Sequence, residues 1–209
     1  YRVKHPKQGD IEFRDLAERV RHTHEDGWSS GSTGWGYKWS HDAARRLVLR
    51  TQTTAVSVRY LATHKKPPIK MYCLSKIFRP DVLDALHAME FHQLDGIVGD
   101  RGINLRHLLG FLKEFAAMLG LGEVKFRPHY FPFTEPSVES YVKHPKLGWV
   151  EFVGSGVFRP EVLRPLGIDF PVIAWGIGFD RLAMIALEID DIRELYSKRL
   201  DWLRMKPLR

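Results

Sequence analysis

Residues 170–189, FPVIAWGIGFDRLAMIALEI, decide the fold because they are typical of a strand, a tight glycine turn and a helix. Gly176 and Gly178 separate the apolar strand segment from the helical segment that follows them. This stretch therefore predicts a strand that leads directly into a helix.

The segments before it predict more strands than helices. Strand-like stretches cover residues 69–80, 90–100, 123–133, 137–145 and 148–158, and a long loop joins the first two. The strands are interleaved irregularly with helices and show no regular βαβ repeat. We therefore predict an α+β fold in which an antiparallel sheet is flanked by helices.

Three helices are predicted outside the last segment. Residues 103–122 place a leucine-rich stripe on one helical face and stop at glycines. Residues 42–63 predict a helix that is broken near residues 50–51, and residues 11–25 predict a helix that Asp10 could cap. Residues 26–40 are glycine-rich and predict a loop whose tryptophans pack.

Composition and charge narrow the class of protein. The 209 residues are 44% hydrophobic and 27% charged, which fits one globular domain over residues 1–209. No apolar run is long enough for a membrane span, and a single cysteine, Cys73, fits a reducing compartment, so we expect a cytoplasmic protein. The net charge of +7 favours contact with polyanions such as RNA. Because the chain starts at Tyr1 without a methionine, we expect a piece of something longer.

Four side chains match the requirements of nucleotide activation. A guanidinium must pair with phosphate, a second cation must hold the far end of the polyphosphate, an aromatic face must stack on adenine, and a carboxylate must hold Mg²⁺. Arg79, Arg181, Phe91 and Glu135 could fill these roles. Each residue alone is more often an ordinary surface or core residue, so only the combination is informative.

Five ordered motifs resemble one known family. The stretches at residues 73–96 and 175–185 resemble the second and third signatures of class II aminoacyl-tRNA synthetases. Those at residues 47–61, 127–139 and 153–169 resemble segments peculiar to the α-subunits of phenylalanyl-tRNA synthetases. The first class signature does not appear. The resemblance implies a ligase that activates L-phenylalanine with ATP and transfers it to tRNA(Phe), within an α₂β₂ assembly with a β-subunit.

The resemblance also implies roles for individual residues. ATP would contact Arg79 and Arg181 through its phosphates and Phe91 through adenine, with Asp81 and Gly178 also at the nucleotide, while Glu135 would hold Mg²⁺ jointly with the partner subunit. Phenylalanine would be bound by the following residues: Thr54, Gln93, Leu94, Asp95, Phe131, Phe133 and Phe158. Strand alternation places Gln93 and Asp95 on one face, as their shared role requires.

Three positions depart from the family pattern. Gln52 replaces a histidine, Asp81 replaces a glutamate, and Asp95 replaces a glutamate of the ammonium site. His87 and His92 fall where the family has histidines, and with no third ligand nearby we do not expect a zinc site. Two alternatives remain open: a related synthetase such as the phosphoseryl enzyme, whose pocket should be polar and basic, and a non-catalytic module that binds tRNA or a partner.

Overall fold

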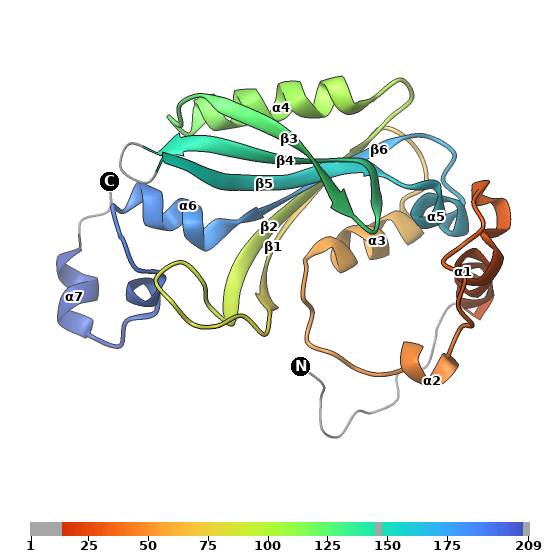
Figure 1. Cartoon of the computed structure of the whole chain (residues 1–209), viewed down its shortest axis with the longest axis horizontal. Coiled ribbons are helices and arrows are strands. Elements are labelled where there is room, and N and C mark those ends of the chain that lie inside the picture. Colours follow the sequence, from red (N-terminus) through yellow and green to blue (C-terminus); the bar gives the residue numbers. More distant parts are fainter. Residues whose placement is uncertain (1–13, 145–147, 207–209) are drawn as a thin grey trace.

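The computed structural model describes residues 14–144 and 148–206. One six-stranded sheet of order β1-β2-β6-β5-β4-β3, antiparallel throughout, runs through the molecule (Figure 1). The strands are β1 Ile69–Phe78, β2 Glu90–Gly99, β3 Val124–Phe131, β4 Thr134–His144, β5 Gly148–Phe158 and β6 Val172–Gly178. The α-helices are α1 Arg14–Asp26, α2 His41–Ala44, α3 Thr54–Thr63, α4 Leu105–Met118, α5 Pro160–Leu163, α6 Phe179–Ala186 and α7 Leu200–Met205. The 3₁₀ helices are η1 Trp28–Ser30, η2 Arg164–Leu166 and η3 Ile192–Tyr196.

Helix α4 covers one face of the sheet (Figure 1). Its buried stripe of Leu108, Leu112 and Ala116 packs against Val153 and Ile177 from the two central strands. Asn104 caps the helix by accepting a hydrogen bond from the Arg106 backbone N–H at 3.0 Å. The amphipathic pattern in the sequence forms this helix because the stripe fills one face of the sheet.

Helices α3 and α5 lie on the other side of the sheet (Figure 1). Leu61 of α3 is fully buried with Ile69, Ile97 and Val172 of the strands in a second core cluster. Alternate residues of β6 enter the two clusters, with Val172 on the α3 side and Ile173 on the α4 side. The sheet is thus packed on both faces, and the α3 side leaves room for a cavity.

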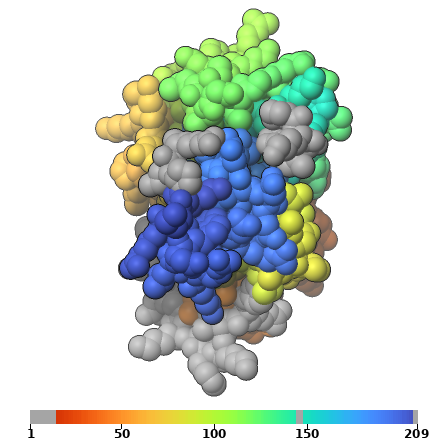
Figure 2. Space-filling view, turned by 90° about the vertical axis from the view of Figure 1, so that its left-hand side faces the viewer, coloured from red at the N-terminus to blue at the C-terminus, as the bar shows by residue number. Residues whose placement is uncertain are grey.

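The C-terminal segment holds the loop between β1 and β2. Met184, Ile189 and Ile192 pack with Ala88 of that loop, and the Ile192 N–H donates to the Ala85 carbonyl at 2.8 Å. Figure 2 shows the loop, in yellow, beside the blue C-terminal segment. This contact fixes one wall of the cavity.

The predicted α+β fold with an antiparallel sheet is confirmed, and the predicted helix at residues 103–122 exists as α4. The predicted helix at residues 42–63 is wrong in its first part, where only α2 forms and residues 41–51 are exposed. A periodic pattern with no surface to bury against does not hold a helix. Asp10 and Ile11 of the predicted first helix lie outside the described residues.

The expectation that the tryptophans of the glycine-rich loop pack is met only in part. The rings of Trp39 and Trp35 pack on His24, with centroid distances of 5.0 and 5.2 Å, whereas Trp28 remains 43% exposed. Among residues 14–144 and 148–206, no helix has the length and apolar character needed to cross a membrane.

Candidate active site

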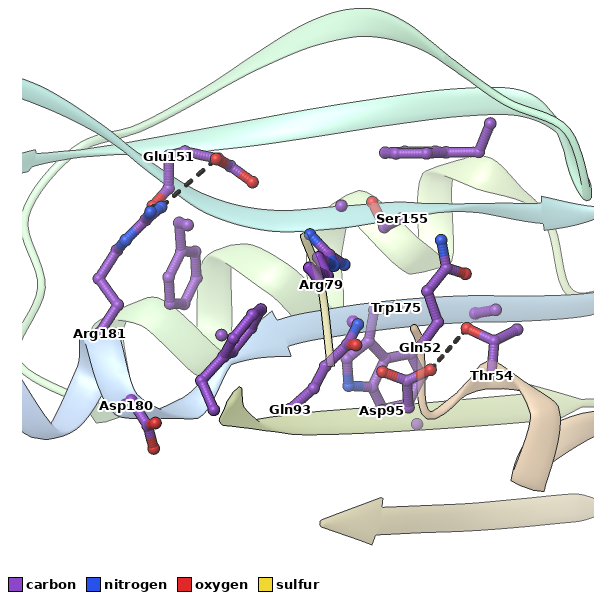
Figure 3. Close-up of a pocket in the computed structure, with 18 of the residues that line it drawn as sticks. Gln52, Thr54, Arg79, Gln93, Asp95, Glu151, Ser155, Trp175, Asp180 and Arg181 are labelled. Carbon is purple, nitrogen blue, oxygen red and sulfur yellow. Dashed lines mark hydrogen bonds and ion pairs between the residues drawn. The ribbon is translucent and has the colours of Figure 1, made fainter. Parts of the chain in front are cut away.

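A cavity of about 370 Å³ opens on the face of the sheet opposite α4. Strands β2, β5 and β6 form its floor, and α3, the β1–β2 loop and the β3–β4 turn contribute to its walls. Figure 3 shows polar and charged side chains from these elements converging on it. Twenty-eight residues spread over the chain line the cavity, so it depends on the complete sheet.

Strand β2 presents its polar residues to this cavity by alternation. Phe91, Gln93 and Asp95 all line it, as the period of two predicts. Leu94 points to the other face and packs in the α4 cluster. The Leu94 side chain therefore does not line the cavity, and its assignment to the phenylalanine site stays a prediction.

Buried polar atoms without partners gather at one end of the cavity. Within the part of the chain that the structure describes, Gln93 Oε1, Asp95 Oδ1 and Ser57 Oγ have no hydrogen-bond partner. Unsatisfied buried polar atoms are costly, and at a binding site they are positions where a ligand can supply the missing partner. An ammonium group, with three N–H donors, is a group that two oxygen acceptors and a hydroxyl would satisfy.

Asp95 carries the charge of this cluster. Its side chain is held by the Thr54 hydroxyl, which donates to Oδ2 at 2.7 Å, and Thr53 ties the start of α3 to the Gln93 carbonyl at 3.2 Å. Burial raises the pKa of Asp95 to about 6, against the opposing effects of the Thr54 hydrogen bond and the Arg79 charge. The carboxylate is thus ionised at neutral pH but held in a poorly solvated position.

Glycines make room for this cluster. A Cβ at Gly176 would lie 2.6 Å from Gln93 Nε2 and 2.9 Å from Asp95 Oδ1. Gly154 pairs with Gly176 across β5 and β6, and a Cβ there would lie 2.9 Å from the Phe131 ring. Only glycine fits at these two positions while Gln93, Asp95 and Phe131 keep their observed conformations.

An aromatic wall stands next to the polar cluster. Phe131, Phe133 and Phe158 all line the cavity, and the first two rings stack with centroids 6.1 Å apart. Phe158 is also part of the core on the α3 side, at 3% exposure. The aromatic positions predicted from the resemblance therefore come together in one wall.

Two arginines line the cavity, and Arg79 is near enough to Asp95 for its charge to act on that carboxylate. The Arg79 guanidinium lies 5.4 Å from the Phe91 ring centroid, and its Nε donates to the Thr51 carbonyl at 3.2 Å. Arg181 Nη1 contacts the Glu151 carbonyl and carboxylate, each at 3.3 Å. Asp81 and Gly178 line the same cavity. A guanidinium beside a flat aromatic ring, with a second guanidinium in the same cavity, suits a nucleotide base and its phosphates.

The predicted metal ligand lies elsewhere. Glu135 is exposed at the start of β4 and does not line the cavity. In the part of the chain that the structure describes, no three acidic, histidine or cysteine side chains are grouped to hold a metal ion. These residues do not form a resident magnesium site by themselves.

Several lining residues were not predicted from the sequence, and Ser57 and Glu151 are two of them. Ser57 lies one helical turn after Thr54 on α3, and this i, i+3 spacing could have identified it. Glu151 meets Arg181, 30 residues later in the chain, through the β5–α6 contact, and no local pattern predicts it. Gln52, a departure from the family pattern, also lines the cavity.

Comparisons with known proteins agree with this arrangement. Residues 10–206 match the family model described as tRNA synthetases class II core domain (F). The phenylalanine–tRNA ligase alpha subunit of Methanoculleus marisnigri is 53% identical over 91% of this chain and 40% of its own length. That of Pyrococcus furiosus is 54% identical over 98% of this chain and 41% of its own length. The chain thus spans about two fifths of these relatives.

A solved structure shows the same fold at low identity. Pyrrolysyl-tRNA synthetase from Desulfitobacterium hafniense superposes with a TM-score of 0.56 at 17% identity, over 72% of this chain and 54% of that one. At this identity the likeness concerns the fold alone. Since the family model spans nearly the whole sequence, the chain belongs to the class II tRNA synthetase core domain (F) family, and the relatives that it resembles are phenylalanine–tRNA ligase alpha subunits.

Proposed function

We propose that this chain is the catalytic core of a ligase that activates L-phenylalanine with ATP and transfers it to tRNA(Phe). The single observation that carries the proposal is the unpartnered cluster of Gln93, Asp95 and Ser57 beside an aromatic wall. An α-amino acid with an aromatic side chain would satisfy the polar cluster and the aromatic wall together, because its ammonium group and its side chain are attached to the same carbon. Phosphoserine would instead require cationic side chains at the positions of Phe131, Phe133 and Phe158.

The carboxylate of such a substrate would then face the end of the cavity with the arginines. Arg79 would hold the α-phosphate of ATP, Phe91 would stack on adenine, and Arg181 would hold the far end of the triphosphate. A carboxylate oxygen attacks the α-phosphorus, the bond to the bridging oxygen breaks, and pyrophosphate leaves with its electron pair. A terminal hydroxyl of the tRNA then attacks the acyl carbon, its proton is released and AMP leaves.

This reaction needs no nucleophile from the protein. Positioning of the two substrates and neutralisation of phosphate charge would supply the rate enhancement. Magnesium would arrive with the triphosphate, which provides most of its ligands in nucleotide sites. No step depends on a metal held by this chain. Because the relatives are named alpha subunits, we also propose a β-subunit partner in an α₂β₂ assembly.

Isothermal titration with phenylalanine, tyrosine and phosphoserine, each with and without ATP and Mg²⁺, tests the proposal. We expect phenylalanine to bind best and more tightly with ATP. Arg79→Ala should weaken ATP binding about 10- to 100-fold, the size expected for losing hydrogen bonds between charged groups. Arg106→Ala, on the exposed side of α4, is the matched control and should change neither affinity.

Three outcomes would contradict the proposal. A preference for phosphoserine would sink the phenylalanine assignment. Phenylalanine binding without any ATP binding would indicate an amino-acid-binding module rather than a ligase. Unchanged ATP affinity in Arg79→Ala would remove Arg79 from the nucleotide site.

A further inference from the structure

A buried carboxylate lies directly before Arg181. Asp180, in the first turn of α6, is 5% exposed. It accepts a hydrogen bond from the His92 backbone N–H at 3.1 Å, a second from His92 Nδ1 at 3.0 Å, and a third from the Tyr196 hydroxyl. Since an ionised carboxylate only accepts hydrogen bonds, this contact requires a proton on Nδ1 of the His92 ring.

The three residues come from three separate parts of the chain. His92 is on β2, Asp180 begins α6, and Tyr196 ends η3. The His92 and Tyr196 rings are parallel to within 3° with centroids 6.4 Å apart, so this ring contact also holds His92 beside Tyr196. This network ties the start of β2 to the start of α6 and to the C-terminal segment.

Each end of the network is next in sequence to a proposed nucleotide contact. Phe91 precedes His92 and faces the cavity, and Arg181 follows Asp180 and reaches towards Glu151 (Figure 3). His92 and Tyr196 do not line the cavity. Lengthening of the Asp180 contacts would therefore change the separation of Phe91 and Arg181, whereas Gln93, although next to His92, is also held through its carbonyl by the Thr53 hydroxyl.

The tyrosine stays a donor at working pH. Burial, followed by the hydrogen bond to Asp180 and the charges of Asp180 and Glu90, raises the pKa of Tyr196 above its ordinary value. A hydroxyl that remains protonated can satisfy the buried carboxylate, which would otherwise lack its third partner.

We propose that Asp180, His92 and Tyr196 form a positioning network that sets the separation of Phe91 and Arg181, and so controls ATP affinity without contributing to phenylalanine binding. The inference rests on the proposed function, because it assumes that ATP occupies this end of the cavity. It assigns Tyr196 and His92 a role that neither their sequence pattern nor their contact with the cavity indicates.

Titration of Tyr196→Phe with ATP and Mg²⁺, and separately with phenylalanine alone, tests this role. The substitution removes one hydroxyl and keeps the ring. We expect ATP to bind about tenfold more weakly, as for one lost hydrogen bond to a charged group, with phenylalanine affinity within about twofold of wild type. Tyr72→Phe, at a residue 79% exposed on β1, is the matched control and should change neither.

Two histidine variants separate positioning from general packing. His92→Asn keeps an N–H donor near the position of Nδ1 and should retain most of the ATP affinity, whereas His92→Ala should lose it as Tyr196→Phe does. Circular dichroism checks that each variant is folded. If Tyr196→Phe does not fold, the two His92 variants still test the inference, and the reverse also holds.

The outcomes distinguish the inference from the proposed function. Wild-type ATP affinity in both Tyr196→Phe and His92→Ala would overturn the inference alone, as would an equal loss of ATP and phenylalanine affinity. A wild-type chain that binds phenylalanine but not ATP would overturn the proposed function, and the inference with it.

Discussion

Asp95→Asn is expected to make the chain more stable at neutral pH and unable to bind phenylalanine. Asp95 is 2% exposed, its Oδ1 has no partner, and its pKa is raised to about 6. A carboxyl whose pKa is raised by about 2 units on folding destabilises the folded state by about 3 kcal/mol once both states are ionised. The asparagine amide still leaves a buried polar atom unpaired, so we expect a net gain of about 2 kcal/mol.

The pH dependence of this gain has a defined sign. Between about pH 4 and pH 6 the folded chain binds more protons at Asp95 than the unfolded chain does, so its stability falls as pH rises. Above pH 7 the penalty is complete, and below about pH 4 it is absent. Thermal unfolding should therefore show Asp95→Asn melting about 5 °C above wild type at pH 7.5 and about 2 °C below it at pH 4, where only the cost of the unpaired amide remains.

The same substitution should remove the counter-charge of the substrate ammonium. We expect phenylalanine affinity to fall at least about 100-fold, since one partner of a desolvated ion pair is lost. Wild-type affinity should also weaken as pH falls below about 6, where Asp95 becomes neutral. This pH dependence should be absent from Asp95→Asn.

Asp42→Asn, on the exposed helix α2, is the charge-matched control and should alter neither the melting temperature nor the affinity. A less stable Asp95→Asn at pH 7.5 would mean that the carboxylate is satisfied in the folded chain. Retained phenylalanine binding would mean that the ammonium is held elsewhere.

Some parts of this molecule could be predicted from the sequence, and others could not. Core positions follow local rules, so the stripe of α4 and the alternation of Gln93 and Asp95 were predicted correctly. Leu94 was assigned from the resemblance against its own alternation, and the structure places it on the other face. Local periodicity thus predicted the direction of the Leu94 side chain, which the resemblance did not address.

Other features depend on contacts between distant segments. Glu151 becomes part of the site only because β5 lies beside β6 and α6. Residues 41–51 have a pattern that favours a helix, but they lie exposed and gain nothing from forming one. Strand order and the presence of a packing surface are non-local, so a pattern within one segment cannot supply them.

The glycine floor is the clearest non-local feature, and it leads to the other large expected effect. Gly176→Ala should weaken phenylalanine binding strongly while the chain stays folded. The added Cβ would meet Gln93 Nε2 at 2.6 Å and Asp95 Oδ1 at 2.9 Å, and both atoms are ends of side chains that can turn away. Alanine is also less costly than glycine within a strand. The backbone can therefore stay in place, and the strain is relieved by displacing the two proposed ammonium contacts.

We expect the affinity of Gly176→Ala for phenylalanine to fall about 100-fold, the equivalent of about 3 kcal/mol, with a melting temperature within a few degrees of wild type. Titration and thermal unfolding of the same samples measure both. Gly110→Ala, where an added Cβ has open space on the outside of α4, should bind normally. Gly96→Ala makes the contrast, because its Cβ would meet the Trp175 ring at 2.2 Å in the core and should destabilise the fold itself. Normal binding by Gly176→Ala would show that the substrate ammonium does not depend on the observed positions of Gln93 and Asp95.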